Sequence, residues 1–342
     1  MGSGQAVAVF GAYGHTGRFV VAELAERGYA PVLSGRDAGR LDALASATGH
    51  EARAASVDDP ASLDRALAGT AAVVNCAGPF AATTGPVVEA ALRAGVPYVD
   101  VAAEIEANAD TFAHFADRAR AAGIVVLPAM AFFGGLGDLL ATAAMDDWTA
   151  ADEAHVAYGL SSWHPTAGTR ASGTVSHDRR DGHRVRFMEG RLEYHTDASP
   201  TLEWTFPEPL GTRTMVGEFT MADVITLPSH LDIPEVRTSM AAGAARDLAD
   251  ADTPAPEAVD ERGRSAQTFM VDVVVRSGAE TRRAVASGQD IYAVTAPLVG
   301  EAVTRILTGR TRTVGVASAG ALFDAPGFLR ALAPHLTVDL RR

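Results

Sequence analysis

Residues 6–17 read AVAVFGAYGHTG, and this stretch decides the fold of the first part of the chain. The run from Ala6 to Phe10 is short and apolar, which is typical of a strand buried on both faces of a parallel sheet. Three glycines follow with Gly-x-x-Gly-x-x-Gly spacing, and residues 16–27 have the apolar spacing of a helix. A glycine turn between strand and helix lets backbone amides approach a phosphate, so the stretch predicts a dinucleotide site. A purely structural glycine turn is the competing interpretation.

The same alternation of strand and helix continues outward to about residue 145. Short apolar runs predict strands at 31–35, 55–57, 71–75, 98–102 and 124–127. Helical spacing lies between them at 40–48, 59–68, 86–94 and 108–122. Repeated strand–helix units indicate an α/β fold, with a doubly wound parallel sheet of the Rossmann type.

The pattern changes from about residue 151, where apolar and polar residues alternate as in half-exposed antiparallel strands. Such segments lie at 153–160, 191–196, 202–206 and 214–220, and a hairpin is predicted from 269–276 and 280–286. Residues 244–266 are rich in Ala, Asp, Pro and Arg and predict a mobile loop. Helical spacing returns at 292–307 and 328–333.

Composition excludes several classes of function. The formal net charge of -13 disfavours nucleic-acid binding, because an acidic surface repels phosphate backbones. The sequence holds one cysteine and no lysine, which excludes an internal disulfide, a Schiff-base lysine, a P-loop lysine and a Tyr-x-x-x-Lys catalytic pair. No apolar run approaches the ~20 residues of a membrane span, and the first residues lack a signal peptide, so we expect a cytoplasmic protein that binds no membrane.

The second strand predicts which dinucleotide is bound. The acceptor for the adenosine ribose is expected about 20 residues after the glycine turn, where Ser34-Gly35-Arg36-Asp37 stands. A guanidinium pairs with a 2′-phosphate, so Arg36 favours NADP over NAD, with Arg40 one helical turn onward; a solvated surface arginine is the alternative. Asp58 is expected to face the adenine or, equally, to cap the helix that begins near Pro60.

Residues 75–80, Asn-Cys-Ala-Gly-Pro-Phe, end the fourth strand, where such a sheet opens beside the cofactor. We expect Cys76 to pack rather than act as a nucleophile, because nothing nearby lowers its pKa. The predicted cofactor-binding residues are Gly11, Tyr13, Gly14, His15, Thr16, Gly17, Gly35, Arg36, Asp37, Asp58, Cys76, Ala77, Gly78, Pro79, Phe80 and Asp100. Asp100 and Glu104 follow the fifth strand and are expected to hold the nicotinamide ribose or orient substrate, with a helix cap as the alternative for Asp100.

Four segments carry a family resemblance: residues 9–18, 33–37, 75–80 together with Gly85, and 95–101. Together they resemble the saccharopine dehydrogenase-like reductases, and most of all a bacterial branch that includes trans-acting enoyl reductases. Weaker similarity extends to 168–172, 224–230 and 290–296. The resemblance implies NADP, a homodimer, and three parts: a Rossmann domain (1–128), an inserted α+β domain with a mixed sheet (129–288), and a C-terminal helical segment returning to the first domain (289–342).

The proton donor of a reduction is expected in a cleft between domains, near 158–170. His164 and Tyr158 are the candidate general acids, although a loop histidine beside proline is more often structural. The candidate substrate-binding residues are Phe132, Phe133, Trp163, Thr169 and Arg170, and packing in the core is an equal alternative for the two phenylalanines. The histidines between 177 and 195 match no zinc spacing, so no metal is expected.

Two functions from different classes fit these residues. The first is an NADPH-dependent oxidoreductase that reduces a C=N, C=C or C=O bond of a small metabolite. The second is a sensor or scaffold that binds NADP(H) without turnover, because a fold does not fix a function. Redox-neutral chemistry with a tightly held cofactor is a further option that the sequence does not separate from reduction.

Overall fold

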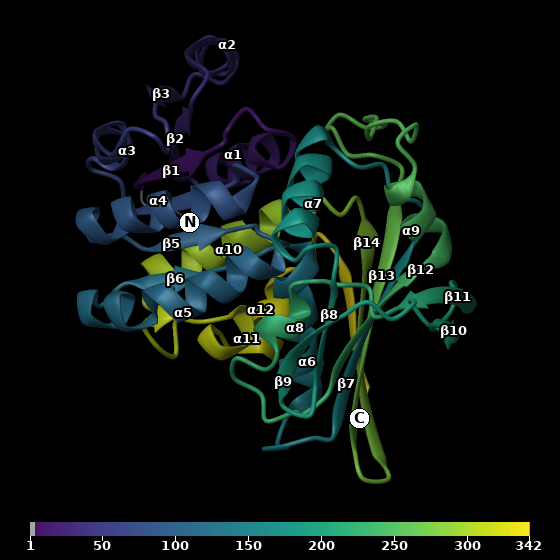
Figure 1. Ribbon diagram of the computed structural model, residues 1–342. Helices are drawn as coiled ribbons and strands as arrows, with labels where there is room; N and C mark the ends of the chain where they lie inside the picture. The colour runs from purple at the N-terminus through teal and green to yellow at the C-terminus, as the bar shows by residue number, and fades with distance from the viewer. Residues whose placement is uncertain (1–3, 342) are drawn as a thin grey trace.

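The computed structural model describes residues 4–341, and it contains two sheets that lie side by side with helices packed on both (Figure 1). The first sheet is parallel throughout. Its strands are β1 (Ala6–Phe10), β2 (Ala30–Gly35), β3 (Glu51–Ala54), β4 (Ala72–Asn75), β5 (Tyr98–Asp100), β6 (Val125–Leu127) and β15 (Gly315–Val316). Their order across the sheet is β15-β6-β5-β4-β1-β2-β3. The helices that connect them are α1 (His15–Glu26), α2 (Ala38–Thr48), α3 (Pro60–Leu67), α4 (Phe80–Ala94) and α5 (Ile105–Ala122).

This first domain confirms the predicted Rossmann-type sheet. Successive residues of β1 point to opposite faces, so Val7 and Val9 enter one apolar cluster while Ala8 and Phe10 enter another. Both clusters are buried, as expected of a strand covered by helices on both sides. The order of strands changes direction at β1 and β4, and the cofactor crevice of such sheets opens at that point.

The second sheet is mixed, as predicted. Its strands are β7 (Glu153–Leu160), β8 (Arg184–Met188), β9 (Arg191–His195), β10 (Thr201–Thr205), β11 (Thr212–Gly217), β12 (Val236–Ala241), β13 (Thr268–Ser277), β14 (Glu280–Gln289) and β16 (Thr337–Arg341). The main path runs β10-β11-β12-β7-β13-β14-β16, and β8 pairs with both β12 and β9. The β7–β12 pair is parallel, whereas β7–β13 and β13–β14 are antiparallel. The helices α7 (Ala167–Arg179), α8 (Asp223–Thr226) and α9 (Ala242–Ala249) belong to this part of the chain.

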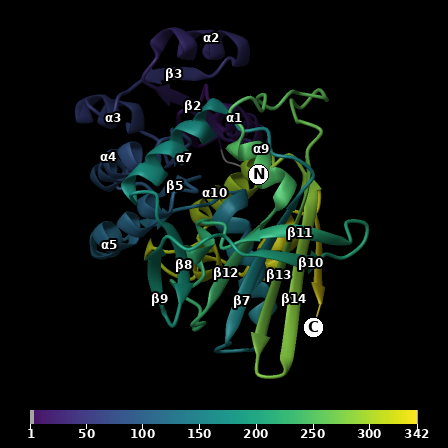
Figure 2. The same cartoon turned by 45° about the vertical axis from the view of Figure 1, so that its right-hand side comes forward.

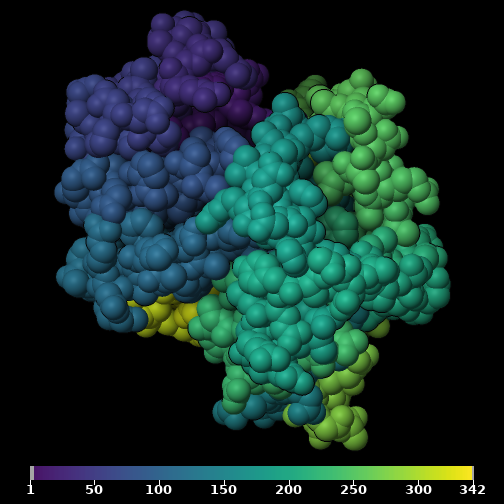
Figure 3. Space-filling model, viewed as in Figure 1, coloured from purple at the N-terminus to yellow at the C-terminus, as the bar shows by residue number. Residues whose placement is uncertain are grey.

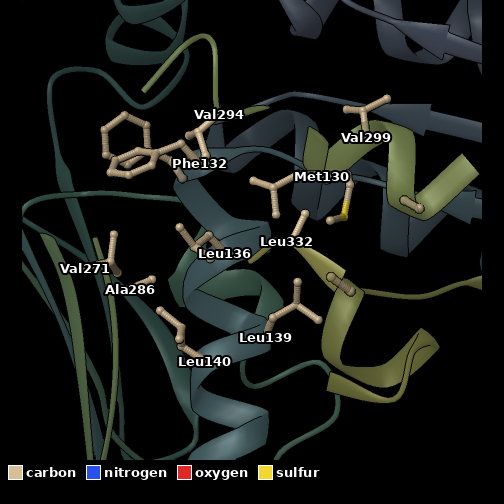
Figure 4. Close-up of a cluster of buried hydrophobic side chains, with 14 of the residues drawn as sticks. Met130, Phe132, Leu136, Leu139, Leu140, Val271, Ala286, Val294, Val299 and Leu332 are labelled. Carbon is tan, nitrogen blue, oxygen red and sulfur yellow. The ribbon is translucent and has the colours of Figure 1, made fainter. Parts of the chain in front are cut away.

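A buried helical layer joins the two sheets. It consists of the kinked turn η1 (Phe132–Leu136), in which Phe133 and Gly134 depart from helical backbone angles, and of α6 (Gly137–Met145), α10 (Thr295–Leu307), α11 (Ala319–Leu322) and α12 (Ala325–Ala331). Figure 4 shows α6 between the sheet residues Val271 and Ala286 on one side and Leu332 on the other. Both sheets therefore share one continuous apolar core, in which the side chains of α6 are buried.

The C-terminal segment contacts both domains. α10 lies against α1, where Arg27 pairs with Glu301 at 2.9 Å, and β15 extends the first sheet. β16, however, pairs with β14 in the second sheet. We propose 1–128, 129–288 and 289–342 as the division into domains, with the last part bridging the other two.

α7 is the element that brings the second domain over the first. It crosses from the second sheet to lie against α4 and α5 (Figures 1 and 2). The space-filling view shows the surface hollowed between α7 and the green segment of the second domain (Figure 3). This arrangement places the polar face of α7 opposite the carboxyl ends of the first sheet.

Several predicted boundaries were wrong. The third strand is Glu51–Ala54 rather than 55–57, because β2 pairs in register with residues 51–54. α4 begins at Phe80 rather than 86, because Glu104 accepts the amide hydrogens of its first turn. The last long helix begins at Thr295 rather than 292, because Asp290 holds the preceding turn through the amides of Tyr292 and Ala293. The predicted mobile loop at 244–266 starts inside α9.

Candidate functional site

One cavity of about 1530 Å³ runs between the two domains. Its floor is formed by the glycine turn after β1 and by the carboxyl ends of β4, β5 and β6. Its other walls come from α7, from residues 216–221 after β11, from α9 and from the turn before α10. Ligand pockets usually measure about 300–1,000 Å³, so this cavity has room for a dinucleotide and a second small molecule.

The glycine turn leaves space for a ligand to lie close to the protein backbone. Gly11 has φ +86°, and a Cβ there would lie 2.8 Å from the amide nitrogen of Ala77. A Cβ on Gly17 would lie 2.2 Å from the carbonyl oxygen of Gly11, so Gly17 lets α1 press against the turn. No side chain caps α1 at Gly14, which leaves the amides and the positive end of the helix for an anion. Gly11, Tyr13, Gly14, His15 and Thr16 line the cavity, and Gly17 supports them from behind.

The adenosine end of the cavity carries two arginines. Arg36 and Arg40 both line it beside Gly35, and within residues 4–341 neither has a carboxylate within ion-pair distance. The Arg40 guanidinium lies over the ring of Tyr13 at 4.4 Å, which fixes its position. Asp37 does not line the cavity: its carboxylate accepts from the amide of Arg40 and caps α2. The side chain of Asp37 therefore has a structural role as the cap of α2.

Asp58 lies in the cavity wall at the same end. The helix that follows is capped by Asp59, whose side chain accepts from the amide of Ser62 at 3.3 Å. The alternative of a helix cap for Asp58 was therefore wrong. Its carboxylate accepts from the hydroxyl of Ser56 at 3.4 Å and remains available at the position expected to face an adenine.

The segment after β4 lines the middle of the cavity through Cys76, Ala77, Gly78 and Phe80, whereas Pro79 does not line it. The Gly78–Pro79 peptide is cis. Burial raises the pKa of the Cys76 thiol, which agrees with the expectation of a packing role.

A buried network holds this segment from below. Asn75 accepts from the amide of Ala77 and donates to the hydroxyl of Tyr98, which donates to Asp100 at 2.8 Å. Asp100 is fully buried and also accepts from the amides of Ala102 and Ala129, so it does not line the cavity. Burial raises the pKa of Asp100 to about 6. The structure thus places Asp100 beneath the predicted cofactor site, where it supports the loops.

Glu104 fixes the same segment from the side. Its two carboxylate oxygens accept from the amides of Phe80 at 2.7 Å and Ala81 at 2.9 Å, so it caps α4 from a distant point in the chain. The sequence suggested that Glu104 holds the ribose or orients substrate. In the structure both of its oxygens instead hold the backbone at Phe80 and Ala81, beside which a ribose would lie.

We expect Glu104→Ala to lower the free energy of unfolding by about 2 kcal/mol, because two buried amides lose their acceptor. Urea unfolding measures this loss. Glu89→Ala is the matched control: Glu89 pairs with Arg118 on the surface, and its removal should cost less than about 1 kcal/mol. Equal losses in the two variants would contradict the capping role.

The far end of the cavity is walled by aromatic rings and by α7. Phe132, Phe133 and Trp163 line it, and the rings of Phe133 and Trp163 stack with centroids 5.0 Å apart. Thr169 and Arg170 line it from the first turn of α7. The structure therefore brings together all five residues that we expected to contact substrate.

The two expected general acids do not line this cavity. Tyr158 is fully buried in β7 and donates its hydroxyl to Asp223 at 2.8 Å. Burial and that neighbouring carboxylate raise the pKa of Tyr158 well above its usual value. His164 lies in the loop after β7, and its backbone carbonyl accepts from Tyr292 at 3.4 Å. The sequence predicted a strand, a loop and a helix here, but it did not predict that the side chains of Tyr158 and His164 lie outside the cavity.

The second domain and the C-terminal segment contribute cavity residues that the sequence analysis did not single out. They include Ser172, His177, Arg180, Arg184, Phe219, Met221 and Tyr292. These residues come from separate elements, and no spacing in the sequence joins them. Of these, Ser172 and Tyr292 lie in segments that the family resemblance marked.

Two negative findings apply to residues 4–341. None of the helices is long and apolar enough to cross a membrane. No group of three or more His, Cys, Asp or Glu side chains in that range is placed to hold a metal ion.

Comparison with known proteins finds similarity to saccharopine dehydrogenases. A sequence model of the saccharopine dehydrogenase NADP binding domain matches residues 7–127. A probable mitochondrial saccharopine dehydrogenase-like oxidoreductase of Arabidopsis thaliana is 32% identical over 140 residues, which span 36% of this chain and 31% of that relative. The apo saccharopine dehydrogenase (L-Glu forming) of Saccharomyces cerevisiae aligns over 99% of this chain and 100% of its own, with a TM-score of 0.67 and 13% identity. The last match shows a shared fold. Residues 7–127 therefore match the saccharopine dehydrogenase NADP binding domain, and the chain as a whole shares the fold of saccharopine dehydrogenase.

Proposed function

We propose that this protein is an NADPH-dependent oxidoreductase that reduces a C=N, C=C or C=O bond of a small metabolite. The observation that carries the proposal is the single cavity that runs from the glycine turn to the aromatic wall at Trp163. Such a cavity can hold a donor and an acceptor side by side, which is what hydride transfer requires. The bacterial branch, the homodimer and the cytoplasmic location stay predictions from the sequence and the resemblance.

The residues of the cavity divide by role. The uncapped N-terminus of α1 and the turn at Gly11 would hold a pyrophosphate, and Arg36 with Arg40 would hold a 2′-phosphate. The backbone set by Glu104 would hold the nicotinamide ribose. A bound NADPH supplies the hydride, and the wall of Phe132, Phe133 and Trp163 keeps water from the acceptor.

The test is sustained oxidation of NADPH by the purified protein with probes of each bond type, namely Δ1-pyrroline, 2-cyclohexen-1-one and benzaldehyde. Turnover with any probe supports an oxidoreductase. Tight binding of NADPH without oxidation by any acceptor, including cell-extract metabolites, would instead support the sensor, which shares the glycine turn but needs no acceptor.

The preference for NADPH should depend on Arg36. We expect Arg36→Ala to weaken NADPH binding by about 10- to 100-fold and to leave NADH binding nearly unchanged, because a charge-assisted pair with the 2′-phosphate is lost. Calorimetric titration with each cofactor measures both constants. Arg65→Ala is the control, because Arg65 is an exposed residue of α3 outside the cavity. Equal affinity of the unmodified protein for NADPH and NADH would contradict the assignment.

A further inference from the structure

Tyr292 lies where three parts of the molecule meet. It stands in the turn before α10 and lines the cavity. Its ring is edge-on to that of His15 at the start of α1, with centroids 5.1 Å apart. Its hydroxyl reaches across to the loop between β7 and α7. Tyr292 thus connects the predicted pyrophosphate site with the substrate wall.

The hydroxyl oxygen of Tyr292 is surrounded mainly by donors. Trp163 donates its indole N–H to it at 3.2 Å, and the backbone N–H of Thr166 does so at 3.3 Å. The hydroxyl of Thr169 lies 3.0 Å away. Indole and amide nitrogens only donate, so they occupy the lone pairs of the phenol oxygen. The hydroxyl proton is directed at the backbone carbonyl of His164 at 3.4 Å, a long and therefore weak hydrogen bond.

The position of α7 adds to this effect. Thr166 is the N-cap of α7, and its side chain accepts from the amide of Thr169. The partial positive charge at the N-terminus of this 13-residue helix therefore lies beside the Tyr292 oxygen. Fixed donors and a helix terminus aimed at one oxygen stabilise negative charge there, as in an oxyanion hole.

We propose that Tyr292 is the proton donor of the reduction, and that Trp163, Thr166 and Thr169 hold the phenolate it leaves. This proposal rests on the proposed function. The acceptor carbon takes the hydride with its electron pair from the reduced nicotinamide. The partner atom of the acceptor double bond takes the proton from the Tyr292 oxygen, and solvent then returns a proton to the phenolate. One hydride and one proton are consumed for each bond reduced.

Ionisable groups around Tyr292 favour the protonated phenol at rest. Burial is the largest influence and raises the pKa of Tyr292, and the carboxylate of Asp290 acts in the same direction. The three donors lower the pKa of Tyr292 in opposition to burial. The other ionisable neighbours are His15 on α1, His164 in the loop and Asp247 of α9, which accepts from the amide of Trp163. Arg170 on α7 is bound to the carbonyls of Asp250 and Thr253.

The experiment compares Tyr292→Phe with the unmodified protein, using NADPH and the three probe acceptors. We expect kcat to fall about 100-fold or more, because a positioned general acid contributes about 10²–10⁴-fold. The dissociation constant of NADPH, measured by calorimetry, should change less than about threefold, because the ring contact with His15 is kept. Tyr194→Phe is the matched control and should keep full activity, since Tyr194 is exposed on β9 outside the cavity.

Two further measurements separate Tyr292 from other donors. The kcat of the unmodified protein should stay level through neutral pH and fall only in the alkaline range, because burial raises the pKa of Tyr292, whereas a histidine donor would make kcat fall near neutral pH. Ultraviolet difference titration, with Tyr292→Phe as the reference, gives the pKa of the phenol without any substrate. Thr169→Val removes one donor and should raise that pKa.

The outcomes separate the two proposals. Retained kcat in Tyr292→Phe, or weakened NADPH binding with unchanged kcat, would overturn the assignment and leave the reductase intact. Binding of NADPH without reduction of any probe would count against the proposed function. The titration then decides on Tyr292: a rise in its pKa in Thr169→Val supports the donor set around the phenolate, and an unchanged pKa overturns it.

Discussion

Replacing Gly17 with alanine should abolish dinucleotide binding. The new Cβ would lie 2.2 Å from the carbonyl oxygen of Gly11 and 3.0 Å from its carbonyl carbon. Both atoms belong to the backbone of the turn, so they move only if the turn itself leaves the position that brings Gly11 against Ala77. We expect the dissociation constant of NADPH to rise about 100-fold or more, with a loss of stability of about 1–3 kcal/mol from overpacking. Calorimetric titration and urea unfolding measure the two effects.

Gly85→Ala is the control for this variant. Gly85 also lies inside a helix, α4, but nothing stands within 4 Å of a Cβ placed there. An alanine at that position should therefore stabilise the protein by about 0.5–1 kcal/mol and leave NADPH binding unchanged. If Gly17→Ala bound NADPH as well as Gly85→Ala does, the close packing of α1 on the turn would not be needed for binding.

The fold was predictable wherever local pattern and burial agree. β7 was predicted at its observed bounds from the alternation of polar and apolar residues at its start, although the structure buries nearly all of the strand rather than one face of it. The hairpin of β13 and β14 was found from the turn at Ser277-Gly278-Ala279, although both strands extend further. β3 was misplaced because residues 55–57 are more apolar than the strand itself. That strand includes Arg53, whose guanidinium pairs with Glu51 at the surface.

The dinucleotide end of the site was predictable because it lies in one short stretch and its chemistry depends on backbone. Gly11 and Gly14 contribute by having no side chain, which lets a ligand approach the backbone. The spacing of glycines in the sequence is enough to predict this contribution. The substrate end was only partly predictable, because it is assembled from η1, α7, the turn before α10 and residues after β11. Tyr158 illustrates the limit. It lies in a strand that the sequence identified, but its side chain turns to a carboxylate 65 residues away.

Asp223 should make the stability of this protein fall between about pH 5 and pH 8. Its side chain is fully buried on α8 and accepts the hydroxyl of Tyr158, with Asp138 nearby. Burial, the largest cause, raises the pKa of Asp223 to about 7. In the unfolded chain the same group titrates near its ordinary value of about 4. The folded state therefore binds the proton more tightly, and its advantage is complete below about pH 4 and is lost as the pH rises through 7.

Asp223→Asn removes this dependence while keeping the size of the side chain and an oxygen that accepts from Tyr158. Relative to the unmodified protein, the variant should gain roughly 2–3 kcal/mol in free energy of unfolding between about pH 5 and pH 8. Urea unfolding at several pH values measures this difference. Asp100, with its own raised pKa, is present in both proteins, so its titration cancels. Asp117→Asn is the control, because Asp117 is exposed on α5 and should give a difference that does not vary with pH. A difference for Asp223→Asn that is equally flat would mean that this carboxyl keeps one protonation state across the range. The carboxyl of Asp223, hydrogen-bonded to Tyr158, would then be either charged throughout the pH range or neutral throughout it.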